Sequence, residues 1–262
     1  MPFALLDRWR SPPPDPRKVA WLGEHDYAHR GLHGAGVPEN SRAAFAAAVA
    51  QGYGIELDVQ RSSDGQPVVF HDDTLERMTA EAGPVARRSA GQLGAIALAG
   101  TAETIPTLRQ VLADVAGRVP VLIEIKSDRD TRIAALCLAV RRVLEGYTGP
   151  HAVMSFDPRV SHWYWRHSPH TVRGYSVSEG EDRALPGKLR RRLALWHARP
   201  DFLAYDIRDL PSGFAARQRR RGLPVIAWTI SSAEHRERAA DHADADIFEG
   251  TVAIAKGAVG RA

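Results

Sequence analysis

The stretch RGLPVIAWTI, residues 221–230, joins the end of a helix to the start of a strand. Cationic side chains complement the negative end of a helix dipole, and a glycine directly after them is a common helix-termination signal. Residues 225–230 are mostly apolar and rich in β-branched side chains, which is typical of a strand covered on both faces. The join therefore predicts helices packed on a buried, parallel sheet.

The same alternation of strand and helix runs along most of the chain. Repetition of this kind implies a parallel sheet with covering helices. Eight strands in about 250 residues favour a TIM-like (β/α)₈ barrel of the α/β class over an open, doubly wound sheet. Strands are expected at 27–29, 54–59, 121–126, 151–155, 172–176, 203–207, 225–230 and 246–249, and helices at 41–51, 107–116, 131–146 and 211–221, among others.

One segment departs from the alternation. The second strand is followed by another extended run, with only Asp64-Gly65 between them, and so short a connection cannot make a parallel crossover. Asp-Gly is a strong hairpin signal, and a hairpin folded at this point is expected to place His71 opposite Asp58. Residues from 72 to about 104 are then a small insertion after the second strand.

Residues 1–24, which include several prolines, are expected to form an N-terminal arm, with the barrel domain spanning 25–262. Phe3, Leu5, Leu6 and Trp9 are expected to hold this arm against the barrel. Contact of the arm with a membrane surface is the second interpretation.

Carboxylates occur where buried strands should be apolar. Glu56 and Asp58 lie two residues apart and therefore point to the same side of their strand, and Glu124 has a similar place in strand 121–126. Buried carboxylates need cations, so a salt-bridge network with Arg30 and Lys126 is one explanation. Their clustering at the C-terminal ends of neighbouring strands, where barrels carry their chemistry, favours a functional site.

Three carboxylates offering only oxygen atoms suit a hard divalent cation, Mg²⁺ or Ca²⁺. The sequence has no Cys/His set with the spacing of a structural zinc site. A metal together with Arg30 and Lys126 could clamp a phosphoryl oxygen, while His29 and His71 could divide acid and base duties near neutral pH. The expected substrate is then a phosphodiester.

The loop after the first strand supports this site. Gly31 lets the backbone turn tightly, and Asn40 or Ser41 is expected to cap the following helix. Glu39 is expected to orient the loop or the metal ligands. Trp228, at the end of a barrel strand, is a candidate for substrate contact.

Five segments carry a specific order of motifs: AHRG…PENS…AF (28–45), ELDVQRSSDGQPVVFHDDTLERMT (56–79), LIEIK (122–126), SFD (155–157) and AWTI (227–230). Together they resemble the glycerophosphodiester phosphodiesterase family, from about residue 27 to 250. The resemblance implies a TIM-like barrel with an insertion, a divalent metal, and hydrolysis to sn-glycerol 3-phosphate and an alcohol through a cyclic phosphate. It assigns acid/base catalysis to His29 and His71, metal binding to Glu56, Asp58 and Glu124, and phosphate contacts to Arg30 and Lys126.

Two positions depart from that family's usual pattern. Ser231 stands where an asparagine usually follows the Trp-Thr strand, and Glu249 ends a strand that usually reads Thr-Asp with a proline soon after. Neither position supplies the groups named above. We therefore expect the departures to affect substrate choice more than catalysis.

Composition narrows the class of protein. Hydrophobic residues make up 44% and charged residues 25%, which argues against disorder, and no apolar run approaches the roughly 20 residues that span a bilayer. The N-terminus has no secretion signal and Cys137 is the single cysteine, so a cytoplasmic protein is expected. The net charge of +4 comes with scattered arginines, and no nucleic-acid partner is expected. The sequence leaves the oligomeric state open.

Two other functions remain beside a hydrolase of lipid and glycerol metabolism. A lysophospholipase D of the same architecture would be favoured by exposed apolar surface near the rim, from the arm or the insertion. A catalytically inactive barrel that binds glycerophosphodiesters is the other alternative. His29 and His71 argue against it, because a binding protein needs no paired proton-transfer groups.

Overall fold

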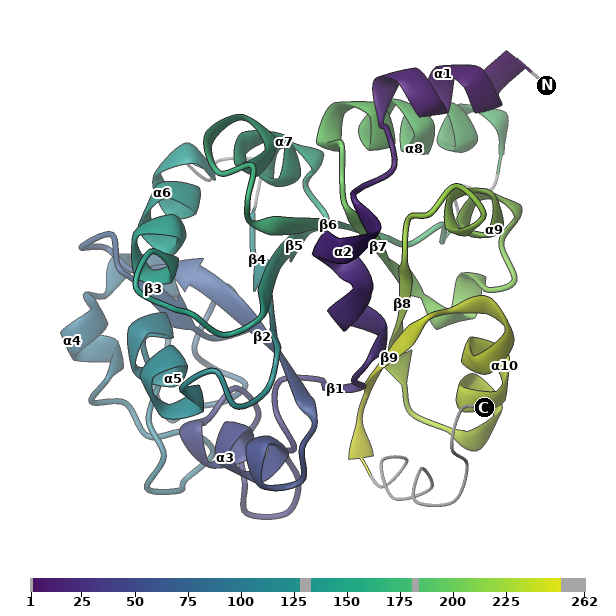
Figure 1. The fold of residues 1–262 in the computed structure, drawn as a ribbon. Helices are drawn as coiled ribbons and strands as arrows, with labels where there is room; N and C mark the ends of the chain where they lie inside the picture. The colour runs from purple at the N-terminus through teal and green to yellow at the C-terminus, as the bar shows by residue number, and fades with distance from the viewer. Residues whose placement is uncertain (1, 128–132, 181–183, 251–262) are drawn as a thin grey trace.

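The computed structural model of the chain describes residues 2–127, 133–180 and 184–250, with residues 2–5 as backbone only (Figure 1). Eight parallel strands follow one another around a closed barrel, and β9 pairs with β1 to complete the ring. The predicted fold class is confirmed. The barrel strands are β1 (Tyr27–Ala28), β2 (Gly54–Arg61), β4 (Val121–Ile125), β5 (His151–Ser155), β6 (Val172–Val177), β7 (Phe202–Asp206), β8 (Val225–Ile230) and β9 (Ala245–Phe248).

Helices cover the outside of the barrel (Figure 1). Each helix predicted above is present, although residues 131 and 132 of the third lie outside the described ranges. Polar side chains accept hydrogen bonds from the first turn of most of them, which marks where each helix begins; these caps are Ser41, Thr107, Asp157, Ser212 and Ser232. The helices are α3 (Arg42–Ala50), α5 (Leu108–Val115), α6 (Ile133–Leu144), α7 (Pro158–His167), α8 (Leu185–Ala198), α9 (Gly213–Arg219) and α10 (Ala233–His242), with a short helix η3 (Ile207–Asp209) after β7.

The predicted hairpin is present, but its register differs from the prediction by one residue. Strand β3 (Pro67–Val69) runs antiparallel to β2, and the backbone N–H of Phe70 donates to the carbonyl of Asp58 at 3.1 Å. Asp58 therefore lies opposite Phe70, and the prediction that it lies opposite His71 is wrong.

Loop length explains the shift. The backbone N–H of Ser62 donates to the carbonyl of Gln66, which leaves three loop residues, 63–65, where the prediction assumed two. Gly65 has φ +83° and closes this turn in the left-handed conformation that such three-residue loops require. One extra loop residue moves every partner on the returning strand by one position.

The insertion after β3 has its own small core. Two short helices, η2 (Val85–Arg87) and α4 (Ala90–Leu93), fold over the hairpin. Their apolar side chains form a cluster separate from the main barrel core, made of Val68, Phe70, Leu75, Val85, Leu93, Ile96, Leu98 and Ile105. This cluster fixes the segment that follows His71.

The N-terminal segment closes one end of the barrel. After α1 (Pro2–Arg10), the short helices α2 (Pro16–Val19) and η1 (Ala20–Gly23) cross the end where the strands begin (Figure 1). Val19 and Leu22 are buried in the same cluster as Tyr27, Leu122 and Phe202, which point into the barrel. The Tyr27 hydroxyl also donates to the carbonyl of Leu22 at 3.1 Å.

The contacts that hold α1 differ from those expected. Leu6 and Trp9 are exposed, while the side chains of Phe3 and Leu5 lie outside what the structure describes. Asp7 instead is fully buried and accepts a hydrogen bond from Trp196 Nε1 of α8 at 2.8 Å. No helix in the described ranges combines the length and the apolar character needed to cross a membrane.

Candidate active site

The three predicted metal ligands meet inside the barrel at the C-terminal ends of β2 and β4. Asp58 lies directly across from Glu124 in the parallel register, and Glu56 points to the same side as Asp58. All three side chains are buried, and one oxygen atom of each lies within 4.8 Å of the others. The strand register therefore brings together carboxylates that are 68 residues apart at most.

Two cations neutralise part of this cluster. Lys126 Nζ lies 3.0 Å from Asp58 Oδ1 and 2.9 Å from Glu124 Oε1, and Arg30 Nε lies 3.3 Å from Asp58 Oδ2. Burial opposes ionisation of Asp58, but Lys126 and the neighbouring cations outweigh it and lower its pKa. Burial, reinforced by the charge of Asp58, raises the pKa of Glu56 to about 8.

The donor set fits a hard divalent cation. Burial also raises the pKa of the Glu124 carboxyl, although Lys126 opposes that rise. Three carboxylates packed so closely are therefore short of positive charge, which a divalent ion would supply. Their oxygen atoms, grouped within 4.8 Å, suit Mg²⁺ or Ca²⁺ better than a thiophilic metal.

His29 follows β1 and lies between two carboxylates. Its Nδ1 is 3.4 Å from Glu249 Oε1, and its Nε2 is 3.9 Å from Glu56 Oε2. Burial lowers the pKa of His29, but the hydrogen bond with Glu249 and the charge of Glu56 outweigh burial and raise it. His33 Nε2 also lies 3.3 Å from Glu249, so this carboxylate holds two histidines of one loop.

His71 has a carboxylate partner of its own. Its Nδ1 lies 2.6 Å from Asp72 Oδ1. Asp72 is in turn held by Arg77, which also donates to Glu39, and the Arg77 hydrogen bond lowers the pKa of Asp72 to about 2. Both histidines therefore have one ring nitrogen oriented by a charged carboxylate, which leaves the other nitrogen for chemistry.

The loop after β1 is held in an unusual backbone conformation. Arg30 and Asn40 both have positive φ, near +55°, which is uncommon for residues other than glycine. Gly31 has φ +81°, and a Cβ there would lie 2.8 Å from the side chain of Ala44. Ser41, not Asn40, caps α3 by accepting from the backbone of Ala44.

Glu39 and Asn40 hydrogen-bond to residues of the site and hold them in place. Asn40 Nδ2 donates to Asp58 Oδ2 at 2.9 Å, and Glu39 accepts from Arg30 at 2.8 Å. Glu39 orients the loop through Arg30 and Arg77, and it makes no contact with the carboxylate cluster in the described residues.

The other eight predicted site residues line one pocket of about 180 Å³. Trp228 lines it together with Phe156, their rings in an edge-to-face arrangement with centroids 5.4 Å apart. Trp228 Nε1 and Ser176 Oγ are buried and have no hydrogen-bond partner within the described ranges. The eight are His29, Arg30, Glu56, Asp58, His71, Glu124, Lys126 and Trp228.

Sequence reasoning missed several participants. Glu249 was expected to supply no chemical group, yet it contacts His29 directly. Asp72 stands beside His71 in the sequence and Phe156 lies in the SFD segment, but neither residue type by itself indicates a contact in the site. Ser231 is absent from the residues lining the pocket, and its hydroxyl lies 3.4 Å from His235 of α10.

A second pocket of about 510 Å³ adjoins the first. His71 and Lys126 line both pockets, and the second continues toward Pro84 and Ala86 of the insertion. An elongated ligand could therefore extend from one pocket to the other past these two side chains.

Comparison with known proteins gives one family. The model of the glycerophosphoryl diester phosphodiesterase family matches residues 29–246. Among curated proteins, glycerophosphodiester phosphodiesterase 1 of Rattus norvegicus is 34% identical over 120 residues. That match covers 42% of this chain and 36% of the rat protein, so the chain spans only about a third of this relative's length.

Solved structures are similar over a larger share of the chain. A phosphodiesterase from Oleispira antarctica, in complex with the product sn-glycerol-3-phosphate, is 27% identical with a TM-score of 0.75, covering 86% of this chain and 92% of that one. A glycerophosphodiester phosphodiesterase from Agrobacterium tumefaciens is 25% identical with a TM-score of 0.65, covering 86% and 95%.

Proposed function

Because the chain belongs to the glycerophosphoryl diester phosphodiesterase family, we propose that it hydrolyses glycerophosphodiesters to sn-glycerol 3-phosphate and an alcohol. One observation carries the proposal: a single pocket holds three carboxylates, two cations and two carboxylate-oriented histidines. The similar Oleispira antarctica enzyme was solved with sn-glycerol-3-phosphate, which supports the product class.

The reaction proceeds in two steps. A glycerol hydroxyl of the substrate attacks phosphorus, the bond from phosphorus to the alcohol breaks, and a cyclic phosphate forms. Water then opens the cyclic phosphate to sn-glycerol 3-phosphate. When bound, a divalent cation held by Glu56, Asp58 and Glu124 would polarise a phosphoryl oxygen. Arg30 and Lys126 stabilise the negative charge that grows on the phosphoryl group.

The two histidines have different neighbours, which suggests their order of action. His71 lines the second pocket, so an alcohol group lying there would leave next to it, and His71 protonates the departing oxygen. His29, deeper beside Glu56 and Glu249, takes the proton of the attacking hydroxyl. In the second step the roles reverse, and His71 activates water.

Substrate choice rests on the first pocket. Trp228 and Ser176 line this pocket, and Trp228 Nε1 and Ser176 Oγ are buried without a partner in the described chain, so glycerol hydroxyls that reached them would satisfy them. About 180 Å³ is enough for a glycerol phosphate but not for an acyl chain. An acyl group would therefore have to lie in the second pocket or outside.

A lysophospholipase D activity is the second candidate, and one observation favours it. The pocket of about 510 Å³ beside the site reaches Pro84 and Ala86 of the insertion, which offers room for an acyl chain near the rim, whereas the exposed Leu6 and Trp9 of the N-terminal arm lie away from it. A cytoplasmic location and a barrel domain over 25–262 with an arm before it complete the proposal.

The test is release of sn-glycerol 3-phosphate from glycerophosphocholine and glycerophosphoethanolamine, with Mg²⁺, with Ca²⁺ and with EDTA, beside a lysophosphatidylcholine. Metal-dependent release from the small diesters supports the proposal. Activity on the lysolipid alone moves the protein to the second candidate. Silence on every substrate with metal present leaves a binding protein and overturns the proposed hydrolysis.

A further inference from the structure

Exposed apolar side chains are concentrated on two adjacent helices away from the active site. The described residues include seven large hydrophobic side chains that are exposed, and five of them lie on α1 and α8. On α8 these are Leu185, Leu189 and Leu193, which are 81%, 52% and 51% exposed. Their spacing of four residues places them in one row along the helix.

The two helices lie side by side, so the two sets of exposed apolar side chains are on neighbouring elements. Figure 1 shows α1 along α8, and Arg192 and Trp196 of α8 both contact Asp7 of α1. Leu6 and Trp9 of α1 are 39% and 70% exposed. We call the exposed face of α1 and α8 the leucine face.

The leucine face is framed by positive charge. Helices α1, α8 and α9 carry eight of the 35 lysines and arginines of the chain but only one of its 31 acidic residues. That acidic residue, Asp7, is fully buried and bound to α8. Every exposed charged side chain on these three helices is therefore positively charged.

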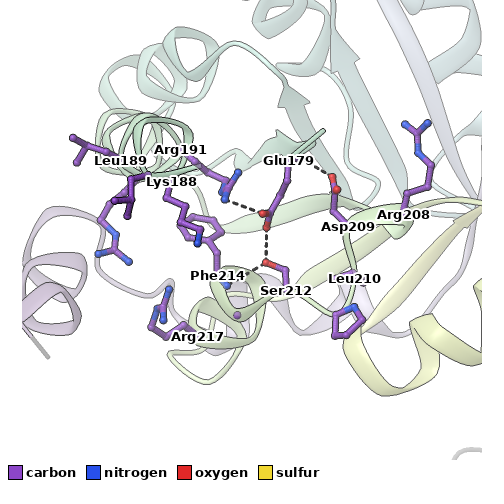
Figure 2. A pocket seen from close by; sticks show the side chains of 14 residues that line it. Glu179, Lys188, Leu189, Arg191, Arg208, Asp209, Leu210, Ser212, Phe214 and Arg217 are labelled. Atoms are coloured by element: carbon purple, nitrogen blue, oxygen red, sulfur yellow. Dashed lines mark hydrogen bonds and ion pairs between the residues drawn. The ribbon is translucent and has the colours of Figure 1, made fainter. Parts of the chain in front are cut away.

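A groove beside α8 combines the same two properties, apolar side chains and positive charge. It has a volume of about 820 Å³ and lies between α8 and α9, with Phe214 and Leu210 in its wall (Figure 2). Figure 2 shows Lys188 and Leu189 on the α8 side and Arg217 on the α9 side. Neither Lys188 nor Arg217 has an ion-pair partner among the residues that the structure describes, whereas Arg191 is paired with Glu179.

We propose that the leucine face docks on the surface of an anionic lipid bilayer. The leucines and Trp9 would enter the boundary between head groups and acyl chains, as the apolar side of an interfacial helix does. Lys188 and Arg217, which flank the groove, would contact the lipid phosphates. Docking would bring the start of α8, which follows β6 at the catalytic end of the barrel, close to the membrane.

Charge favours a bilayer over a second copy of the chain. In a two-fold symmetric dimer the same patch meets itself, so this surface would oppose cations with cations. An anionic lipid surface removes that repulsion and gains attraction from every exposed lysine and arginine on the patch.

The experiment is co-sedimentation of the full chain with vesicles of phosphatidylcholine alone or with about 30 mol% phosphatidylglycerol, at about 0.1 M and about 0.5 M NaCl. We expect binding to the anionic vesicles at low salt and weaker binding at high salt. The pair Leu189→Glu and Leu193→Glu, and separately the pair Lys188→Glu and Arg217→Glu, should each reduce partitioning at least about 25-fold. The matched control is Leu138→Glu, which replaces an exposed leucine on another helix, α6. This variant should bind the vesicles as the wild type does.

The outcomes separate this inference from the proposed function. Both double variants should hydrolyse glycerophosphocholine at the wild-type rate, because none of these four residues lines the catalytic pocket. Absence of vesicle binding by the wild type overturns the docking surface, whatever its activity. So does a wild-type dimer in sedimentation velocity that the leucine pair dissociates, or equal loss of binding in the Leu138→Glu control.

Discussion

At the C-terminal ends of the barrel strands, Glu56, Asp58 and Glu124 are buried beside one another with only part of their charge neutralised. At the opposite end, Val19 and Leu22 cover the strand starts and pack against apolar side chains inside the barrel. One barrel thus carries a charged end and an apolar, closed end.

The difference teaches where function and stability reside. Crowded carboxylates cost folding free energy, and they are kept at the end that carries the chemistry. Positive φ angles do not separate the ends, because Ala116 and Arg199, just before β4 and β7 begin, have them as well as Arg30 and Asn40. The apolar end contributes burial and no reactive group. Substitutions at the catalytic end should therefore change turnover more than stability, and substitutions at the closed end should do the reverse.

The largest effect is expected at the catalytic end, from His71→Ala. Removal of a positioned general acid typically lowers rates by about 10² to 10⁴-fold. Affinity for Mg²⁺ or Ca²⁺, measured by calorimetric titration, should stay nearly unchanged, because His71 is not among the clustered carboxylates. A variant that keeps most of its turnover would show that the acid/base assignment is wrong.

At the closed end, Leu22→Ala should be strongly destabilising. Leu22 is fully buried, and truncations of this kind cost about 2–5 kcal/mol in the free energy of unfolding. Turnover measured well below the melting temperature should remain within about twofold of wild type. Leu138→Ala, at a leucine that is 37% exposed, is the control and should change unfolding little. A large loss of turnover in Leu22→Ala would break the division between the two ends.

The charge of Glu56 should make metal-free stability depend on pH. Burial raises its pKa in the folded state to about 8, above its unfolded value, so the folded protein holds the proton that the unfolded chain releases. Stability is then highest below the unfolded pKa and falls as pH rises toward 8, by up to about 1.4 kcal/mol per pH unit. Thermal unfolding in EDTA from pH 5 to 8 tests this.

Two comparisons sharpen that experiment. In Glu56→Gln the fall with pH should become smaller, leaving the part that comes from Glu124 and His29, whose pKa values are also raised, and metal should bind more weakly because one carboxylate is lost. In the wild type, a divalent cation should cancel the fall, because it binds the ionised carboxylates. An identical pH dependence in Glu56→Gln and wild type would exclude Glu56 as its source.

Of the two substitutions at the catalytic end that should lower turnover, Glu249→Gln should have the smaller effect, about tenfold. The substitution removes the charge that helps to raise the pKa of His29, so the limb of the pH–rate profile that His29 controls should move to lower pH. Movement of the acidic limb identifies His29 as the base of the rate-limiting step, and movement of the alkaline limb identifies it as the acid. Glu249→Asp, which keeps the charge, should move the limb less. An unmoved profile would mean that Glu249 does not act through His29.

Much of the barrel was predictable because strand and helix periodicities are local. Glu56, Asp58 and Glu124 stood out because charge on a buried strand is rare. The hairpin register was missed because Asp64-Gly65 signals a turn but does not say whether the loop holds two residues or three. Glu249 was missed because its partner His29 lies 220 residues away, and only barrel closure brings β9 beside β1.

Barrel closure also has a consequence for the order of folding. Asp7 is bound by Trp196 and Gln218, which follow it by 189 and 211 residues. During synthesis at about 5–20 residues per second, the first helix must therefore wait on the order of ten to forty seconds before its partners exist. Contacts of such long range form late. We therefore expect the N-terminal segment, although synthesised before the barrel strands, to be among the last parts of the chain to dock, after the strands that it covers have closed.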